Sequence, residues 1–224
     1  MSREQIVEAV ITYSKLGFQM SMHANGDAAI DNVIDAVVEA RKQGVEVIRP
    51  RIEHCSIVQN DQLISLKEHD ISGSFLIGHV YYWGSAFRDN IFGEKKAIKL
   101  DRCGSFERMG IPFSLHSDAP VIEISPLEMV EIAVTRRTWA DPNYVLGPKE
   151  CASVEAALRG VTSVPAWQLM SEHEVGSLEG GKFADFVILA DDPRKVKPET
   201  IGEIKVVETW IDGRKVYANS ESEK

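Results

Sequence analysis

Short apolar runs alternate with segments of helical periodicity up to about residue 172 of the chain. The segment 27–42 shows the helical pattern clearly, because Ile30, Val33 and Val37 fall on one face. An alternation of this kind is typical of βα units, in which helices cover a parallel sheet. The sequence therefore predicts an α/β fold with four parallel strands, at residues 18–24, 49–55, 71–77 and 112–118.

Helix starts are marked by residues that can cap free N–H groups. Ser2 and Gln5 have capping-box spacing, and Ser125 precedes a proline at a first helical position. Asn60 and Ser153 stand in the same way before apolar-periodic segments. Between the third and fourth strands we predict a Gly- and aromatic-rich loop at 79–84, then a single helix that ends near Met109.

The pattern changes after residue 172. Residues 176–181 are rich in turn formers, and 183–189 form a short apolar run. Two further strand-like runs, 206–211 and 214–217, flank the pair Asp212-Gly213, which is a type I′ hairpin signal. We therefore predict two parts, an α/β part at 1–172 and an all-β part at 173–224.

Composition narrows the function classes. The chain has 224 residues, 25 Lys and Arg against 34 Asp and Glu, and a net charge of −9. An acidic chain without a basic run is a poor candidate for binding nucleic acid. No apolar stretch approaches the roughly 18 residues that a membrane span needs. Three widely spaced cysteines without a CxxC pair are typical of reduced thiols, so we expect a cytoplasmic protein.

Candidate chemistry lies at the strand ends, where parallel α/β folds carry their active sites. The first two strands end at His23 and His54, the loop after the third begins with His79, and the fourth ends with His116 and Asp118. Strand periodicity places His23 on the polar face of the first strand, and His116 and Asp118 on the polar face of the fourth. We expect these side chains to converge on one rim.

Three kinds of chemistry fit such a rim. A divalent metal needs convergent imidazole and carboxylate ligands, which His23, His54 and Asp118 would supply. A Ser-His-Asp triad is less favoured, because the chain has no G-x-S-x-G nucleophile elbow. Phosphate binding is less favoured again, because Gly180-Gly181-Lys182 lacks the P-loop spacing.

Several segments together resemble the amidohydrolase superfamily, and within it the third amidohydrolase family of metal-dependent hydrolases. The matching segments keep the family's order, and they are His23-Ala24-Asn25-Gly26-Asp27, Arg51-Ile52-Glu53-His54, Ser117-Asp118-Ala119-Pro120-Val121 and residues 176–185. The resemblance implies a (β/α)8 barrel with an appended β-sandwich. The chain would be the C-terminal half of that fold: the fifth to eighth barrel strands at 1–172 and sandwich strands at 173–224.

The resemblance also assigns roles. His23, His54 and Asp118 would bind the metal, with zinc the expected ion, and Asp118 would take a proton from the hydrolytic water. His79, Tyr81, Trp83 and His116 would contact the substrate. The family's His-x-His pair and its bridging lysine on the fourth strand have no counterpart here, and no His-x-His occurs in the chain.

The sequence thus predicts a metal-dependent hydrolase of non-peptide carbon–nitrogen bonds that acts on a small molecule. Its missing ligands would come from another chain, either a complementing N-terminal half or a second copy in a homodimer. Two alternatives remain open. The half-barrel could be a non-catalytic module that assembles through bare sheet edges. It could also be a binding protein that holds an apolar ligand with the aromatic loop.

Overall fold

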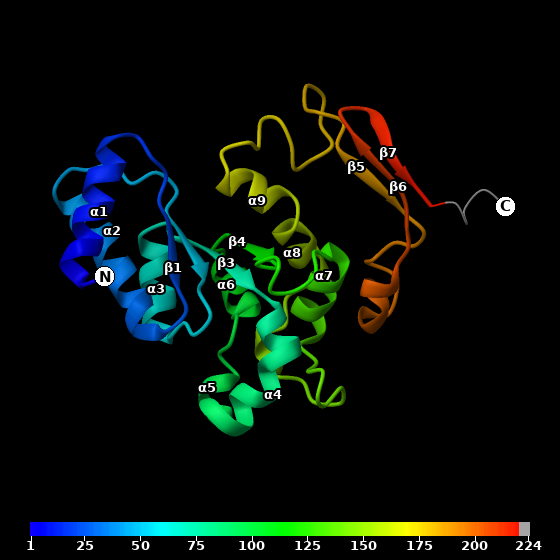
Figure 1. Cartoon of the computed structure of the whole chain (residues 1–224), viewed down its shortest axis with the longest axis horizontal. Helices are drawn as coiled ribbons and strands as arrows, with labels where there is room; N and C mark the ends of the chain where they lie inside the picture. Colours follow the sequence, from blue (N-terminus) through cyan, green and yellow to red (C-terminus); the bar gives the residue numbers. More distant parts are fainter. Residues whose placement is uncertain (220–224) are drawn as a thin grey trace.

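A computed structural model describes residues 1–219, and a parallel sheet lies at its centre (Figure 1). The strand order is β1-β2-β3-β4. The strands are β1 (Ser21–Ala24), β2 (Arg51–His54), β3 (Ser72–Leu76) and β4 (Phe113–His116). All three pairings are parallel, which confirms the predicted α/β class, although each strand is shorter than its apolar run. Within the described residues β1 and β4 each have one neighbour, so both outer edges of the sheet are unpaired.

Helices connect and flank these strands. At the β1 end of the sheet lie α1 (Arg3–Lys15), α2 (Asp27–Lys42) and α3 (Asn60–Glu68). Around β4 lie α6 (Cys103–Met109), α7 (Pro126–Thr135), α8 (Val154–Gly160) and α9 (Ser163–Gln168). The capping box of Ser2 with Gln5 is present, and the Ser153 hydroxyl caps α8.

The predicted cap at Asn60 is wrong, and the one at Ser125 is confirmed in position but not in its hydrogen bond. Gln59 takes the N-cap position of α3 and forms a capping box with Gln62. The Asn60 side chain instead accepts a hydrogen bond from Arg102, because α3 packs against the segment that carries this arginine. Ser125 occupies the N-cap position of α7, but its hydroxyl makes no capping hydrogen bond.

The segment 79–109 also differs from its prediction. It holds a π-helix η1 (His79–Trp83), α4 (Gly84–Ala86), a second π-helix η2 (Phe87–Ile91) and α5 (Glu94–Ala97) before α6 begins. The predicted loop is thus helical, and the predicted single helix is broken. The breaks fall where Gly93 and Asp101 adopt φ angles of 72° and 44°, which no right-handed helix accommodates.

The C-terminal part forms a separate three-stranded antiparallel sheet of β5 (Phe186–Leu189), β6 (Val206–Ile211) and β7 (Arg214–Ala218). Asp212 and Gly213 have φ angles of 50° and 69°, as the predicted type I′ turn requires. The prediction of an all-β tail is wrong, because the 3-10 helix η4 (Pro198–Glu203) precedes β6 and packs against α7. Residues 1–219 contain one antiparallel sheet here and no second sheet packed on it.

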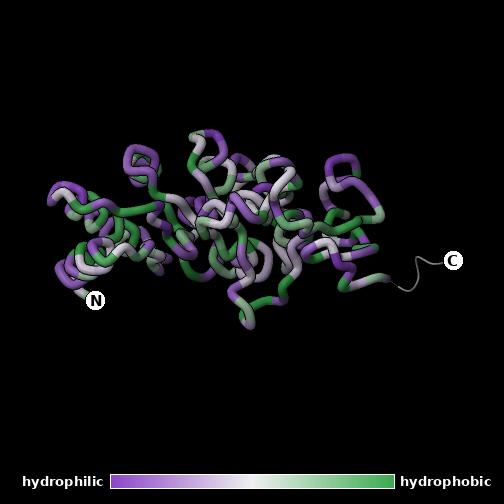
Figure 2. The backbone as a smooth tube through the Cα atoms, turned by 90° about the horizontal axis from the view of Figure 1, so that it is seen from above, coloured by the Kyte–Doolittle hydropathy of each residue, from purple (hydrophilic) through white to green (hydrophobic). Residues whose placement is uncertain are grey.

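The hydrophobic core lies between the parallel sheet and its helices. Ile30 and Val37 of α2, Ile52 of β2 and Phe75 of β3 are fully buried in it. Seen from above, the molecule is elongated, with α1 and the small sheet at opposite ends (Figure 2). No helix in the described part of the chain is long and apolar enough to cross a bilayer.

Candidate active site at the carboxyl ends of the parallel strands

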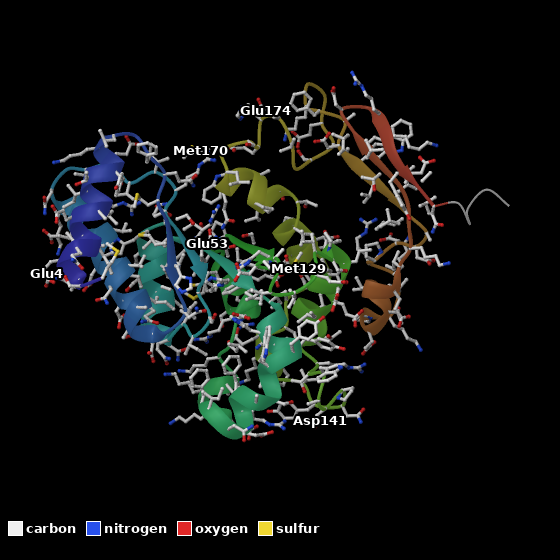
Figure 3. The ribbon with its side chains drawn as sticks, in the orientation of Figure 1. Glu4, Glu53, Met129, Asp141, Met170 and Glu174 are labelled. Atoms are coloured by element: carbon white, nitrogen blue, oxygen red, sulfur yellow. The ribbon has the colours of Figure 1, made fainter. Side chains whose placement is uncertain are left out.

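One face of the parallel sheet carries a row of polar side chains. Register places His23 beside Glu53, Glu53 beside Ser74, and Ser74 beside Ser114, so that each strand contributes one member. A cavity of about 370 Å³ opens over this face and is lined by residues of β2, β3, β4, the loop after β4, and α9. Figure 3 shows Glu53 in the space between the sheet and α9. The polar face predicted from strand periodicity is therefore concave and accessible.

Three histidines meet at the end of this sheet. The ring of His54 lies 4.5 Å from that of His23 and 5.1 Å from that of His116, between centroids. Strict alternation would place His54 on the buried face with Ile52. His54 instead has a φ angle of 66°, which rotates its Cβ about the N–Cα bond and brings the ring to the other two.

Burial sets the charge state of two of these rings. Burial lowers the pKa of His54, and the nearby His116 and His23 rings lower it further. Burial also lowers the pKa of His116, although Glu53 and Asp118 act in the opposite direction. Both rings therefore favour the neutral form, in which an imidazole nitrogen keeps a free lone pair.

The other predicted site residues surround this cluster. Asp118 is exposed and lines the same cavity as His54 and His116. His79, at the start of η1, has its ring 6.4 Å from that of His54, and Trp83 packs edge-on against His79 at 5.8 Å. Tyr81 lies deeper and packs against the hydrophobic core.

The donor set agrees in part with a metal centre. His54 Nδ1 and His116 Nε2 are buried and have no hydrogen-bond partner in residues 1–219, so they are available as ligand atoms. Within the same residues, however, no three His, Cys, Asp or Glu side chains already stand in a metal-binding arrangement. The cluster has the chemistry of a metal site but does not enclose one by itself.

Polar contacts that the sequence did not reveal support the cluster. Asn25 Nδ2 lies 3.3 Å from His23 Nε2, and Ser56 Oγ donates to Asn25 Oδ1 at 2.8 Å. Ser56 Oγ also lies 3.3 Å from His79 Nδ1, and Asp101 Oδ2 lies 3.8 Å from the same nitrogen. For Asn25 and Ser56 the signal was their position within two residues of a strand-end histidine. Asp101 gave no such signal, because it lies between two short helices far along the chain.

Residues outside the cluster that could have been catalytic have other partners. Asp27, in the first turn of α2, forms an ion pair with Lys96 at 3.0 Å. Glu53 accepts hydrogen bonds from Ser21 at 2.5 Å and from Arg51 at 2.6 Å. Burial would raise the pKa of Glu53, but these partners outweigh burial and lower it. Glu53 is thus an ionised carboxylate that anchors the polar face.

Comparison with known proteins identifies the family of the chain. The sequence model of the Amidohydrolase family matches residues 1–217. The chain therefore belongs to the amidohydrolase superfamily, in its third family. It is 31% identical over 212 residues to an N-substituted formamide deformylase of Arthrobacter pascens, which is 95% of this chain and 39% of that relative.

Solved structures show the same relation. A metal-dependent hydrolase of Pyrococcus furiosus is 31% identical, with a TM-score of 0.74 over 87% of this chain and 38% of that one. A metal-dependent hydrolase of Pyrococcus horikoshii is 26% identical, with a TM-score of 0.74 over 88% of this chain and 39% of that one. The chain thus spans about two fifths of the length of the proteins it matches.

Proposed function

We propose that this chain supplies the second half of an amidohydrolase active site that hydrolyses the carbon–nitrogen bond of a small, non-peptide amide. The convergence of His23, His54 and His116, with two unpartnered buried nitrogens, carries the proposal. A substituted formamide is the substrate class to test first, because a relative that matches 95% of the chain is a deformylase of such compounds.

His23, His54 and Asp118 would hold a divalent ion, with zinc the expected one. When bound, such an ion lowers the pKa of water and polarises a carbonyl. The exposed carboxylate of Asp118 can accept a proton from water at the cavity wall. His116 lines that cavity, and the ring of His79 lies 6.4 Å from that of His54. His79, with Trp83 beside it and Tyr81 behind, would contact the substrate together with His116.

The chain lacks some of the metal ligands of its family, and the exposed flank beside β1 suggests which part would supply them. No strand among residues 1–219 pairs with the outer edge of β1, and beside it lies an apolar groove of about 470 Å³ between α1, β1 and α2. Leu16 and Phe18, which follow α1, are exposed by 67% and 61%. We propose that the N-terminal half of an amidohydrolase barrel covers this flank and contributes the missing ligands.

Metal analysis tests the metal centre directly. The purified chain is equilibrated with zinc, freed of excess metal and measured by mass spectrometry and thermal unfolding. We expect bound zinc and a raised melting temperature, both lost in His54→Ala and kept in His173→Ala, whose histidine is 70% exposed and far along the chain. Zinc uptake equal in the two variants, or none in the parent chain, contradicts the metal assignment.

Measurements of activity and of assembly distinguish a hydrolase from a non-catalytic half-barrel and from a binding protein. Formate release from N-substituted formamides, by the chain alone or mixed with a separately produced N-terminal half, supports the hydrolase. A non-catalytic assembling half-barrel would sediment as a complex and release no formate. A binding protein would hold an apolar ligand equally well with and without zinc.

A further inference from the structure

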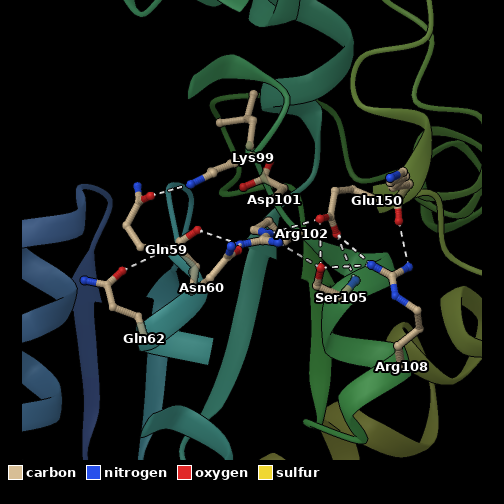
Figure 4. A network of polar contacts seen from close by, with 12 residues as sticks. Gln59, Asn60, Gln62, Lys99, Asp101, Arg102, Ser105, Arg108 and Glu150 are labelled. Atoms are coloured by element: carbon tan, nitrogen blue, oxygen red, sulfur yellow. Dashed lines mark hydrogen bonds and ion pairs between the residues drawn. The ribbon is translucent and has the colours of Figure 1, made fainter. Parts of the chain in front are cut away.

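Asp101 is an acidic residue buried near the guanidinium of Arg136 and the ring of His79. Its side chain is completely buried, and neither carboxylate oxygen has a hydrogen-bond partner among residues 1–219. In Figure 4 it lies beside the polar network of Arg102 without joining it. A buried carboxylate without partners is destabilising, and groups of this kind concentrate at functional sites.

The surrounding backbone holds Asp101 in place. Its N–H donates to the carbonyl of Ser56 at 2.8 Å. The buried guanidinium of Arg136 donates to the carbonyls of Asp101, Leu100 and Leu146 at 2.8, 2.6 and 2.6 Å. Asp101 also has a φ of 44°, a conformation that a non-glycine residue keeps only when its surroundings impose it. Tertiary contacts therefore fix where this carboxylate stands.

The carboxylate faces the ring of His79 and also interacts with the buried charge of Arg136. Asp101 Oδ2 and His79 Nδ1 are 3.8 Å apart, and the histidine side chain is 17% exposed. Trp83 and Phe87 contact the His79 ring edge-on, with centroids at 5.8 and 6.0 Å. These aromatic neighbours restrict rotation of the ring, so that Nδ1 stays on the side of Asp101.

The hydrogens available on each side chain decide which group donates at each of these contacts. The Ser56 hydroxyl has one hydrogen, which goes to Asn25 Oδ1 at 2.8 Å. Ser56 Oγ can therefore only accept at its 3.3 Å contact with His79, so His79 Nδ1 is the donor. At the other end, Asn25 Nδ2 donates to His23 Nε2 at 3.3 Å, so this nitrogen presents its lone pair.

The opposite donor order requires a flipped Asn25 side-chain amide, with its oxygen facing His23 and its nitrogen facing Ser56. His23 Nε2 would then donate, and Ser56 would donate to His79 Nδ1. That order would point the lone pair of His79 Nδ1 at the Asp101 carboxylate, where two electron-rich atoms would face each other at 3.8 Å. The carboxylate thus selects the first direction on electrostatic grounds.

We propose that Asp101 is a positioning residue that keeps the proton of His79 on Nδ1 and, through Ser56 and Asn25, leaves His23 Nε2 unprotonated. An unprotonated imidazole nitrogen is what a metal ligand requires, and His23 Nε2 would give up its contact with Asn25 to bind one. The other nitrogen of His79, Nε2, is left for a substrate. The roles of His23 Nε2 toward a metal and of His79 Nε2 toward a substrate rest on the proposed function, whereas the proton positions do not.

Long-range nitrogen–proton spectra of the full chain test the proposal. The histidine rings are labelled with nitrogen-15 and a chelator removes metal. Burial lowers the pKa of His79 but the Asp101 carboxylate outweighs burial and raises it, so the pH is increased until the ring signals stop changing and both rings are neutral. Loss of signals in His79→Gln and His23→Gln assigns the two rings. We expect both rings to carry the proton on Nδ1. A His79 proton on Nε2 in the unaltered chain overturns the proposal.

Three variants isolate Asp101. Asp101→Leu removes the carboxylate that selects the direction, so His79 and His23 should each lose their single proton position. Asp101→Asn retains an acceptor oxygen and should retain the original pattern. Ser56→Ala should leave His79 unchanged and release His23 from its single proton position. An unchanged spectrum in Asp101→Leu, or a moved His79 proton in Ser56→Ala, contradicts the proposal.

The test by these spectra requires neither that Asp101→Leu folds nor that the chain is catalytically active. If Asp101→Leu does not fold, the spectra of the unaltered chain and of Ser56→Ala still decide. Because the spectra are recorded on metal-free protein, absence of zinc binding or of formate release would refute the proposed function and leave these proton positions standing.

Discussion

The buried ion pair of Arg102 and Glu150 offers a sharp test of how the segment carrying Asp101 is held (Figure 4). The two side chains are 9% and 8% exposed and meet at 3.0 Å. Glu150 also accepts from the Ser105 hydroxyl and backbone N–H, each at 2.8 Å, and Arg102 donates to Asn60 at 2.8 Å. Glu150→Ala would leave the guanidinium buried without its counter-charge.

Removing one partner of a buried pair costs about 3–5 kcal/mol. For a chain of this size, 1 kcal/mol shifts the melting temperature by about 2–4 °C, so we expect a loss of roughly 6–20 °C. Urea and thermal unfolding followed by circular dichroism would measure it. The double variant with Arg102→Met should recover part of the loss, because it removes the uncompensated charge as well.

The matched control is Glu155→Ala, which breaks an exposed contact with Arg194 at 4.0 Å. Exposed pairs contribute about 0–1 kcal/mol, so this variant should unfold almost as the parent chain does. The reasoning is refuted if Glu150→Ala loses no more stability than Glu155→Ala. It is also refuted if adding Arg102→Met to Glu150→Ala deepens the loss.

Two further predictions concern the site histidine and a close backbone approach. Burial lowers the pKa of His54, so below about pH 6.5 the unfolded chain takes up more protons than the folded one and stability falls. His54→Gln should flatten this fall in urea unfolding between about pH 5 and pH 8, whereas His173→Gln should not. Gly104→Ala would place its Cβ 2.7 Å from the Cys151 carbonyl and should cost about 1–3 kcal/mol. Gly180→Ala meets open space and should change stability by less than about 0.5 kcal/mol; equal effects would contradict the packing.

Local signals predicted several local features, although the cap expected at Asn60 falls on Gln59. The Ser2 and Ser153 caps and the Asp212-Gly213 turn each depend on a few adjacent residues, and the structure has all of them. The prediction of a single helix ending near Met109 was wrong, because the segment is broken into several short helices. Its interruptions include Asp101, whose φ of 44° is held by Arg136 from a distant part of the chain. No local pattern encodes such a contact.

The sequence by itself determined the parallel sheet, the family, and the candidate residues at the strand ends. Hydrophobic periodicity and the order of short motifs specify these, because both depend on spacing along the chain. Only the tertiary structure decided which atoms meet. His54 reaches His23 and His116 through a positive φ that alternation does not foresee, and Asp101 reaches His79 from 22 positions along the chain. Such contacts depend on how distant segments pack, so the chemistry of the rim emerges only in the folded chain.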